Sequence, residues 1–355
     1  MRNAIRALLI CVAALSPLPA GAWDYPGHRI VGAIADLVLS SHDPDVYNKV
    51  MKLLATKDAS GNDVKRTLSQ VAVFPDCAKP DNELYCGRPP SEEEKGYVRR
   101  NPHNGAYHYT DIPLGQSSYV AYSPGTEEDD VVQMIKFAVK QLRAKSAGDK
   151  PKMRDVSLTD AEALWLLAHL VGDIHQPLHV GAMFFDKETC TTAVDPNTVP
   201  GGMANVASTT GGNDIKLVAL APAPAVPPAD NLHFFWDGAA VAKAMQADGL
   251  AGSEQEFARL LASEAPANWQ SAGDPDTWAE QWAADIMPLA RDAHDPARLT
   301  IALKERKVSP AGKVTCTWNT QIKPEYSGWG KDRAREQLRK AGFRLAALIE
   351  AIFKP

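Results

Sequence analysis

The densest group of residues that could do chemistry is the segment AHLVGDIHQPLH, residues 168–179. His169 and Asp173 stand four residues apart, so on a helix their side chains project from one face about a turn apart. Pro177 is expected to end that helix, and His179 follows in the loop beyond. Imidazole nitrogens and carboxylate oxygens are zinc ligands, but a single pair of this kind also fits a hydrogen-bonded helix pair.

The rest of the chain supplies further donors of the same two kinds. The segment NLHFFWDG carries His233 and Asp237, again four residues apart. An apolar run in VAVFPDC ends on Asp76, YHYTDIP carries His108, and His28 follows AGAWDYPG. One zinc ion needs only three or four protein ligands. The donors are therefore numerous enough for more than one ion.

The first 22 residues have the pattern of a secretory signal peptide. Two basic residues precede the apolar run Ala7–Leu15, which is too short to span a bilayer, and a small-residue cleavage pattern ends at Ala22. The alternative is an ordinary buried N-terminal helix. Cleavage would leave a secreted or periplasmic domain of residues 23–355 that begins at Trp23. Because the sequence has no other apolar run of membrane-spanning length, no stable membrane association is expected.

The mature chain would have 333 residues (355 minus 22), enough for one large domain. No internal repeat or domain boundary is visible, so a single domain is predicted, and a monomer is expected. The chain has 38 basic and 43 acidic residues; without the two signal arginines, its net charge is about −7. An acidic surface gives no general attraction for nucleic acid, although bound cations can reverse the charge locally.

Four cysteines remain after the predicted cleavage: Cys77, Cys86, Cys190 and Cys316. An even number in an exported chain indicates two disulfides, for which three connectivities exist. Cys77 and Cys86 are close enough to close one short loop, and Cys190–Cys316 would then be the long-range bridge.

Helical periodicity predicts a mainly α fold. Helices are expected over His28–Ser40, Pro44–Leu54, Asp129–Lys145, Thr159–Ile174, Phe234–Met245, Glu254–Glu264, Thr277–Arg291 and Asp332–Phe353. Asp43 is the expected N-cap of the second, and Thr159 with Glu162 forms a capping box. NDIKLVAL gives the best strand signal. Two long irregular regions, Phe74–Glu127 and Gly181–Asp230, interrupt the helices, and the charged run SEEEK is interpreted as solvated surface.

In this order along the chain, the motifs resemble those of the type I (S1/P1) nucleases, which belong to the zinc-dependent phospholipase C superfamily. The matching pieces are Trp23 with His28 five residues later, then FPDC, YHYTD, HLVGDIHQPLH, GGNDI, NLHFFWD and KAGFRLAALIEAIF. The family consists of extracellular enzymes that cleave single-stranded nucleic acid with three zinc ions. The resemblance implies a single globular helical domain of this type, with long loops and a minor β-hairpin.

The resemblance also implies how the donors are distributed among three zinc ions. The first would be held by Asp76, His108, His169 and Asp173. The second would be held by His28 and by the amine and carbonyl oxygen of Trp23, with Asp173 bridging these two ions. The third would be held by His179, His233 and Asp237.

Other residues near these motifs have two interpretations each. Asp111 is a candidate for orienting the nucleophilic water or binding a base, or it caps a turn. Tyr109 would stack on an unpaired base, or it belongs to the core. Asn213 would donate a hydrogen bond near the metals, or it shapes a turn. Pro113 and Gly238 stand where fungal relatives have polar or acidic residues, so neither an acid–base assignment nor a base preference carries over.

Four further histidines are interpreted as surface residues or as supports for the ligands: His42, His103, His175 and His294. The predicted function is a zinc-dependent endonuclease that hydrolyses single-stranded DNA and RNA to 5′-phosphorylated products, with 3′-nucleotidase activity as a further expectation. One alternative is a phospholipase C with the same metal core. The other is a zinc-binding protein without catalytic activity.

Overall fold

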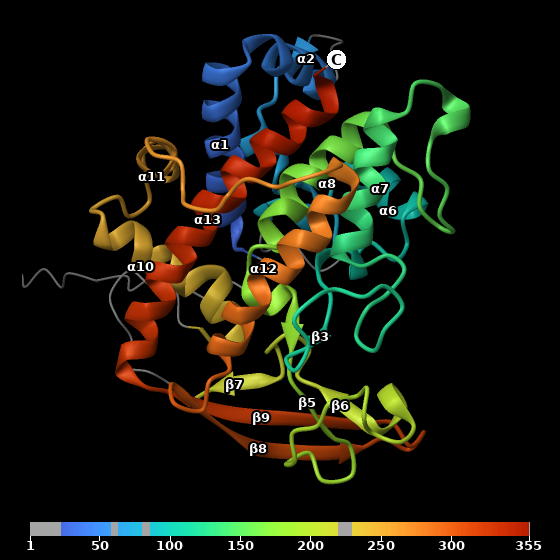
Figure 1. Cartoon of the computed structure of the whole chain (residues 1–355), viewed down its shortest axis with the longest axis vertical. Helices are drawn as coiled ribbons and strands as arrows, with labels where there is room; N and C mark the ends of the chain where they lie inside the picture. The colour runs from blue at the N-terminus through green and yellow to red at the C-terminus, as the bar shows by residue number, and fades with distance from the viewer. Residues whose placement is uncertain (1–22, 58–62, 80–85, 219–228, 355) are drawn as a thin grey trace, which may run out of the picture.

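The computed structural model describes residues 23–57, 63–79, 86–218 and 229–354, whose arrangement Figure 1 shows. Helices fill the upper part of that view, and the longer strands lie together at its lower end. The predicted signal peptide of residues 1–22 lies outside the described residues. Among the described helices, none combines the length and the apolar character needed to cross a membrane.

Helix α8 (Asp160–Asp173) lies at the centre of the helical part (Figure 1). It begins with the predicted capping box, since Thr159 and Glu162 each accept a hydrogen bond from the other's backbone N–H. All its residues from Glu162 onward are buried, which is typical of a helix that is apolar on all sides. It packs against α1 (Tyr25–His42), α7 (Val131–Arg143) and α13 (Pro324–Phe353). The mainly α fold is confirmed.

The remaining helices are shorter. They are α2 (Pro44–Leu54), α3 (Leu68–Val71), α4 (Phe74–Cys77), α6 (Glu92–Arg100), α9 (Leu232–Phe234), α10 (Ala240–Ala247), α11 (Glu254–Ala262) and α12 (Trp278–Ala293). Short helical turns are η1 (Ala106–His108), η2 (Ala147–Asp149), η3 (Pro177–His179), η4 (Gly202–Asn205), η5 (Phe235–Ala239) and η6 (Pro275–Thr277). Helix α2 has the predicted boundaries, and Asp43 accepts the N-capping bond from the Val46 N–H.

The region Phe74–Glu127 contains more regular structure than the sequence predicted. It holds α4, α6 and η1. The run SEEEK is the start of α6 and not simply solvated surface, because Ser91 and Glu94 form a capping box. Glu94 is buried and pairs with Arg88 at 2.7 Å. The bonds that Glu94 accepts from Ser91 and Arg88 stabilise the start of α6. The charges of the run do not reveal these bonds in the sequence.

The strands form small sheets. They are β1 (Thr56–Lys57), β2 (Asp63–Val64), β3 (Ile112–Pro113), β4 (Gly181–Ala182), β5 (Phe184–Asp186), β6 (Val206–Ser208), β7 (Ile215–Leu217), β8 (Leu299–Val308) and β9 (Val314–Ile322). In the largest sheet, β9 lies between β7, to which it is parallel, and β8, to which it is antiparallel. The predicted strand in NDIKLVAL is β7. The long hairpin β8–β9 was not located from the sequence, because most of β8 is exposed and the short alternation of Leu299, Ile301 and Leu303 gives way to a charged run.

Two cysteine pairs stand at disulfide distance. The Cα atoms of Cys77 and Cys86 are 5.6 Å apart, and those of Cys190 and Cys316 are 6.1 Å apart. Both separations lie in the usual range for a bridge. The expected connectivity, one of three possible, is the one found. The long-range bridge ties β9 to the segment that follows β5.

Candidate metal centre

Four buried donors from three elements meet beside the end of α8; they are called the four-residue group. They are Asp76 from α4, His108 from η1, and His169 and Asp173 from α8. His169 Nε2 lies 2.9 Å from His108 Nδ1, and each of these nitrogens lies 3.1 Å from Asp173 Oδ2. Asp76 Oδ1 lies 3.8 Å from both nitrogens. The predicted i, i+4 pair on one helix face therefore gains two partners from distant segments.

Asp173 faces a second donor with its other oxygen. Its Oδ1 lies 3.3 Å from His28 Nε2, and the His28 ring stacks on His169 with centroids 3.6 Å apart. Within the described structure, Asp173 Oδ1 and both nitrogens of His28 are shielded from solvent and have no hydrogen-bond partner. Buried polar atoms without a partner are rare and costly in folded proteins, and a bound ion is one way in which they are satisfied. The two oxygens of Asp173 thus face two different sets of donors.

Trp23 anchors the start of the described chain between α8 and η5. Its indole is buried, and Nε1 donates a hydrogen bond of 2.7 Å to the Gly172 carbonyl. The next residue, Asp24, donates its backbone N–H to the Asp237 carbonyl at 3.0 Å. The start of the described chain is consequently tied to the residue that precedes Asp173 through the Trp23 indole and to Asp237 through the Asp24 backbone.

Three more buried donors form a separate group, called the trio: His179 of η3, His233 of α9 and Asp237 of η5. His233 Nε2 lies 3.1 Å from His179 Nε2 and 3.2 Å from Asp237 Oδ2. The helix predicted over Phe234–Met245 starts earlier, at Leu232, and passes through the π-helical turn η5 before α10. Such turns occur frequently at functional sites.

Backbone carbonyls fix the far nitrogen of three of these histidines. His169 Nδ1 donates to Ala72 O (2.5 Å), His179 Nδ1 to His108 O (2.6 Å) and His233 Nδ1 to Gly211 O (2.7 Å). This leaves Nε2 of each ring with its lone pair directed at the donor groups, which is the usual arrangement of metal-binding histidines. Gly211 has a φ of +55°, and a Cβ there would lie 2.3 Å from the Leu178 carbonyl, so a side chain would be excluded.

The neighbouring histidines keep the Asp173 carboxylate charged. Burial opposes ionisation of Asp173, but His169 and His179 hold its pKa well below the usual range. Burial, with the nearby Lys79, lowers the pKa of His108 to about 3. Burial would also lower the pKa of His179, yet Asp173 and Asp237 raise it to about 9.

A cleft of about 200 Å³ opens onto the trio and onto His108. Tyr109, Asp111 and Asn213, all singled out from the sequence, line it. Tyr109 is 40% exposed and so does not belong to the core. Asp111 Oδ2 accepts a hydrogen bond from Ser208 Oγ at 3.0 Å, whereas Oδ1 has no partner among the described residues. Burial raises the pKa of Asp111 to about 6.

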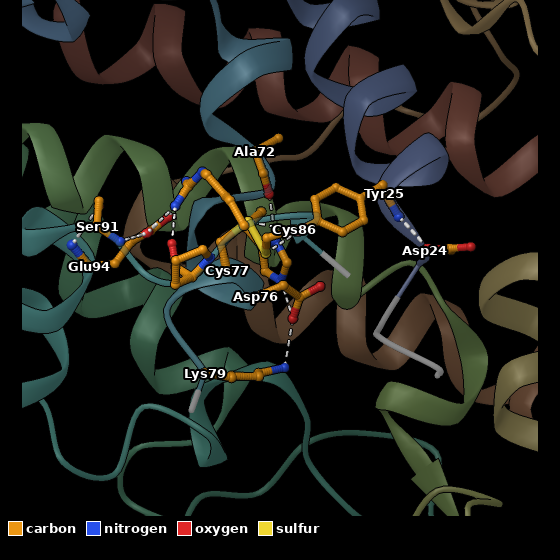
Figure 2. Close-up of a disulfide and its surroundings, with 12 residues drawn as sticks. Asp24, Tyr25, Ala72, Asp76, Cys77, Lys79, Cys86, Ser91 and Glu94 are labelled. Carbon is orange, nitrogen blue, oxygen red and sulfur yellow. Dashed lines mark hydrogen bonds and ion pairs between the residues drawn. A yellow bond between two sulfur atoms is a disulfide. The ribbon is translucent and has the colours of Figure 1, made fainter. Parts of the chain in front are cut away.

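Lys79 also lines the cleft, and it was not identified from the sequence. Its Nζ lies 2.7 Å from Asp76 Oδ1, as Figure 2 shows. Lys79 could have been identified from its position three residues after Asp76, because side chains at this spacing on a helical turn are neighbours. It is the cation closest to the four-residue group among the ion pairs of the described structure.

The Cys77–Cys86 bridge lies directly beside this site (Figure 2). Cys77 follows Asp76 in the chain, and the Tyr25 hydroxyl lies 2.7 Å from Cys77 Sγ and also contacts Cys86 Sγ. Tyr25 is the first residue of α1, two residues after Trp23. The bridge therefore contacts both the segment that carries Asp76 and the start of the described chain.

The four remaining histidines lie outside the donor groups. His42 and His103 are exposed, as expected. The expectation of a surface or supporting position is wrong for His294, which is 2% exposed and donates from Nδ1 to the Ala290 carbonyl. His175 is also buried, and its Nε2 lies 3.0 Å from Arg344 Nη1. Helix packing buries His294, which its polar sequence neighbours do not indicate.

Taken together, three sets of His and Asp side chains have ligand atoms close enough to hold metal ions: His28, Asp76 and His169; His108, His169 and Asp173; and His179, His233 and Asp237. The model of the S1/P1 nuclease family matches residues 23–354, and every one of these donors lies within that match. A search among curated proteins finds no match. The chain belongs to the S1/P1 nuclease family.

Proposed function

We propose that this protein is a zinc-dependent endonuclease that hydrolyses single-stranded DNA and RNA to 5′-phosphorylated products outside the cytoplasm, with 3′-nucleotidase activity on the same site. The observation that carries the proposal is Asp173. Its two oxygens are buried and face two sets of donors, and a third set lies within the adjoining cleft. A carboxylate placed this way suits two neighbouring cations.

The donors suit zinc in type and spacing. Zinc bonds to nitrogen and oxygen of about 2.0–2.1 Å imply ligand atoms about 3.3 Å apart around a tetrahedral ion. The spacings of 2.9–3.8 Å in the four-residue group and 3.1–3.7 Å in the trio bracket that value. The unpartnered atoms of His28, Asp173 and Asp237 supply lone pairs that nothing else in the described structure uses.

The ligand assignment that we propose involves three ions. The first is held by Asp76, His108, His169 and Asp173. The second is held by Asp173, His28 and the backbone of Trp23 once its amine is free. The third is held by His179, His233 and Asp237. When bound, closely spaced zinc ions supply positive charge for the phosphate and lower the pKa of a water molecule that serves as nucleophile.

The charges favour a polyanionic substrate at the cleft and not elsewhere. Three dications and three ligand aspartates leave a local charge of about +3, inside a chain whose own charge is about −7. Lys79 adds a further cation at the cleft wall. A single-stranded nucleic acid would accordingly be attracted to the cleft, whereas the general surface repels it.

The residues of the cleft have separate roles in this proposal. Asp111 accepts a hydrogen bond from the attacking water through Oδ1, which has no other partner among the described residues. Tyr109 offers an exposed ring on which an unpaired base stacks, and stacking of this kind tolerates any base. Asn213 also lines the cleft, where its side chain contacts phosphate or base; its Nδ2 donates one bond of 3.0 Å to the Thr210 carbonyl.

The test combines metal analysis with hydrolysis assays on purified mature protein. We expect about three zinc ions per chain and metal-dependent cleavage of single-stranded DNA and RNA. His233→Ala should lose one ion and most activity, whereas His42→Ala, which changes an exposed histidine, is the matched control and should lose neither. Fewer than two ions in active protein would overturn the proposal. Hydrolysis of phosphatidylcholine in place of nucleic acid would identify a phospholipase C, and metal binding without hydrolysis would identify a zinc-binding protein.

A further inference from the structure

Gln176 is a fully buried amide that lies between the donor groups. It follows α8 and is the N-cap of η3, and its side chain is 0% exposed. Its Nε2 donates a hydrogen bond of 2.6 Å to Asp237 Oδ1, and its Oε1 accepts one of 2.5 Å from the Leu178 N–H. Its backbone continues the chain from Asp173 to His179, to whose N–H it presents its carbonyl at 3.1 Å.

The bond from Gln176 makes the surroundings of the two Asp237 oxygens different. Oδ1 accepts the bond from Gln176 and lies 3.7 Å from His179 Nε2, whereas Oδ2 has no hydrogen-bond partner among the described atoms and lies 3.2 Å from His233 Nε2. The bond to the Leu178 N–H also fixes the turn from which His179 projects. One side chain therefore sets the orientation of two members of the trio, although Gln176 and Asp237 are 61 residues apart in the sequence.

We infer that Gln176 is a positioning residue for the metal site of the trio: it holds Oδ1 of Asp237 by a hydrogen bond, so that Oδ2, which has no such partner, is the oxygen presented to a metal ion. This inference rests on the proposed function, because it concerns one of the three proposed zinc ions. A carboxylate that offers a single oxygen contributes one ligand, so the trio contributes three. A site with three protein ligands retains room for water or substrate, which is the property of catalytic zinc sites. The trio faces the cleft, where such room is useful.

Gln176→Met tests the inference, because methionine has a similar length but can neither donate to Asp237 nor accept from Leu178. The matched control is Gln141→Met. Gln141 is also a buried glutamine whose Nε2 donates to an aspartate, Asp160 Oδ1 at 2.8 Å, but it lies on α7 outside the donor groups. Zinc affinity is measured by competition with a chelator. Because loss of a residue that orients a ligand costs about 10- to 100-fold in metal affinity, we expect that loss for one of three ions in Gln176→Met. Gln141→Met should keep all three affinities.

A second pair of variants covers the case in which the methionine variants do not fold. Gln176→Asn keeps a polar amide but is one methylene too short to reach Asp237, and Gln141→Asn is its control. The selective weakening of one ion is expected again, together with an altered visible spectrum of the cobalt-substituted protein. Equal affinities in wild type and Gln176→Asn, or equal weakening of all three ions, would overturn the inference. Fewer than two ions in the wild-type protein would instead overturn the proposed function, so the two failures are distinguishable.

Discussion

Replacing Asp173 by asparagine should remove two zinc ions at once, whereas replacing Asp237 should remove only one. Both substitutions turn a buried carboxyl group into a neutral amide of similar shape. Asp173 presents Oδ2 to His108 and His169 and Oδ1 to His28, which belong to two donor sets. Both oxygens of Asp237 face members of one set, with Oδ2 3.2 Å from His233 Nε2 and Oδ1 3.7 Å from His179 Nε2. The pair of variants therefore separates the loss of a bridging ligand from the loss of any buried carboxylate.

The expected size follows from linkage. A metal ion present at 100 times its dissociation constant stabilises the native state by about 2.7 kcal/mol. The entropy of unfolding is about 2.1 cal/mol/K per residue, which gives about 0.7 kcal/mol/K for the mature chain of 333 residues (355 minus 22). Each ion should thus raise Tm by about 4 °C. Zinc should raise Tm by about 12 °C in the wild type, about 8 °C in Asp237→Asn and about 4 °C in Asp173→Asn.

Calorimetry of each variant with and without zinc, beside metal analysis, measures these differences. Comparing each variant with its own metal-free form cancels the direct effect of the substitution on the apoprotein. Free zinc is buffered at 100 times the weakest wild-type dissociation constant. Loss of one ion and a similar Tm shift in both variants would refute the bridging role of Asp173.

The other predictions concern the N-terminus, pH and strandedness. A protein that starts Met-Trp23 should fold but bind one zinc fewer and lose most activity, because the Trp23 amine becomes an amide; three ions and full rate would contradict this. Burial raises the pKa of Asp111 to about 6, and bound cations lower it from there, so the wild-type rate should fall as the pH falls through or below 6. Asp111→Asn should be slower by about 10²- to 10⁴-fold at neutral pH and should lack this acidic limb; an unchanged pH–rate profile would argue against its role. Duplex DNA should be cut roughly 10²-fold more slowly than single strands at matched salt, because exposing a base costs a few kcal/mol, and equal rates would count against base stacking.

Local signals predicted the helices well, since caps and apolar spacing lie within a few residues of each other. Helix α2 has its predicted boundaries, and Thr159 with Glu162 forms the predicted box at the start of α8. The donors on α8 could be found for the same reason, because His169 and Asp173 share one helical face. The other donors were found from their residue types, and the family resemblance supplied their distribution among three ions. The structure brings the side chains of the trio and of the four-residue group together.

Features that depend on contacts between distant segments were missed. The bond from Gln176 to Asp237 has no local signature, and the burial of His294 depends on how α12 packs. Most of β8 is exposed along its length, and only its first half, with Leu299, Ile301 and Leu303, shows the apolar alternation that predicts strands. From the sequence, Glu94 was placed on the solvated surface. Its ion pair with Arg88, which lies in the chain before the helix that contains Glu94, was missed.

The anchoring of Trp23 has a consequence for when such an enzyme becomes active. Its indole is already seated against Gly172, and this fixes the backbone at the point where the predicted signal peptide ends. Removal of that peptide would then expose an amine next to the donors without any refolding. The cut would work like the activation of a zymogen. The precursor would lack one metal ligand while it shares a compartment with the cell's own messenger RNA. Export and cleavage would supply that ligand only where the RNA is out of reach.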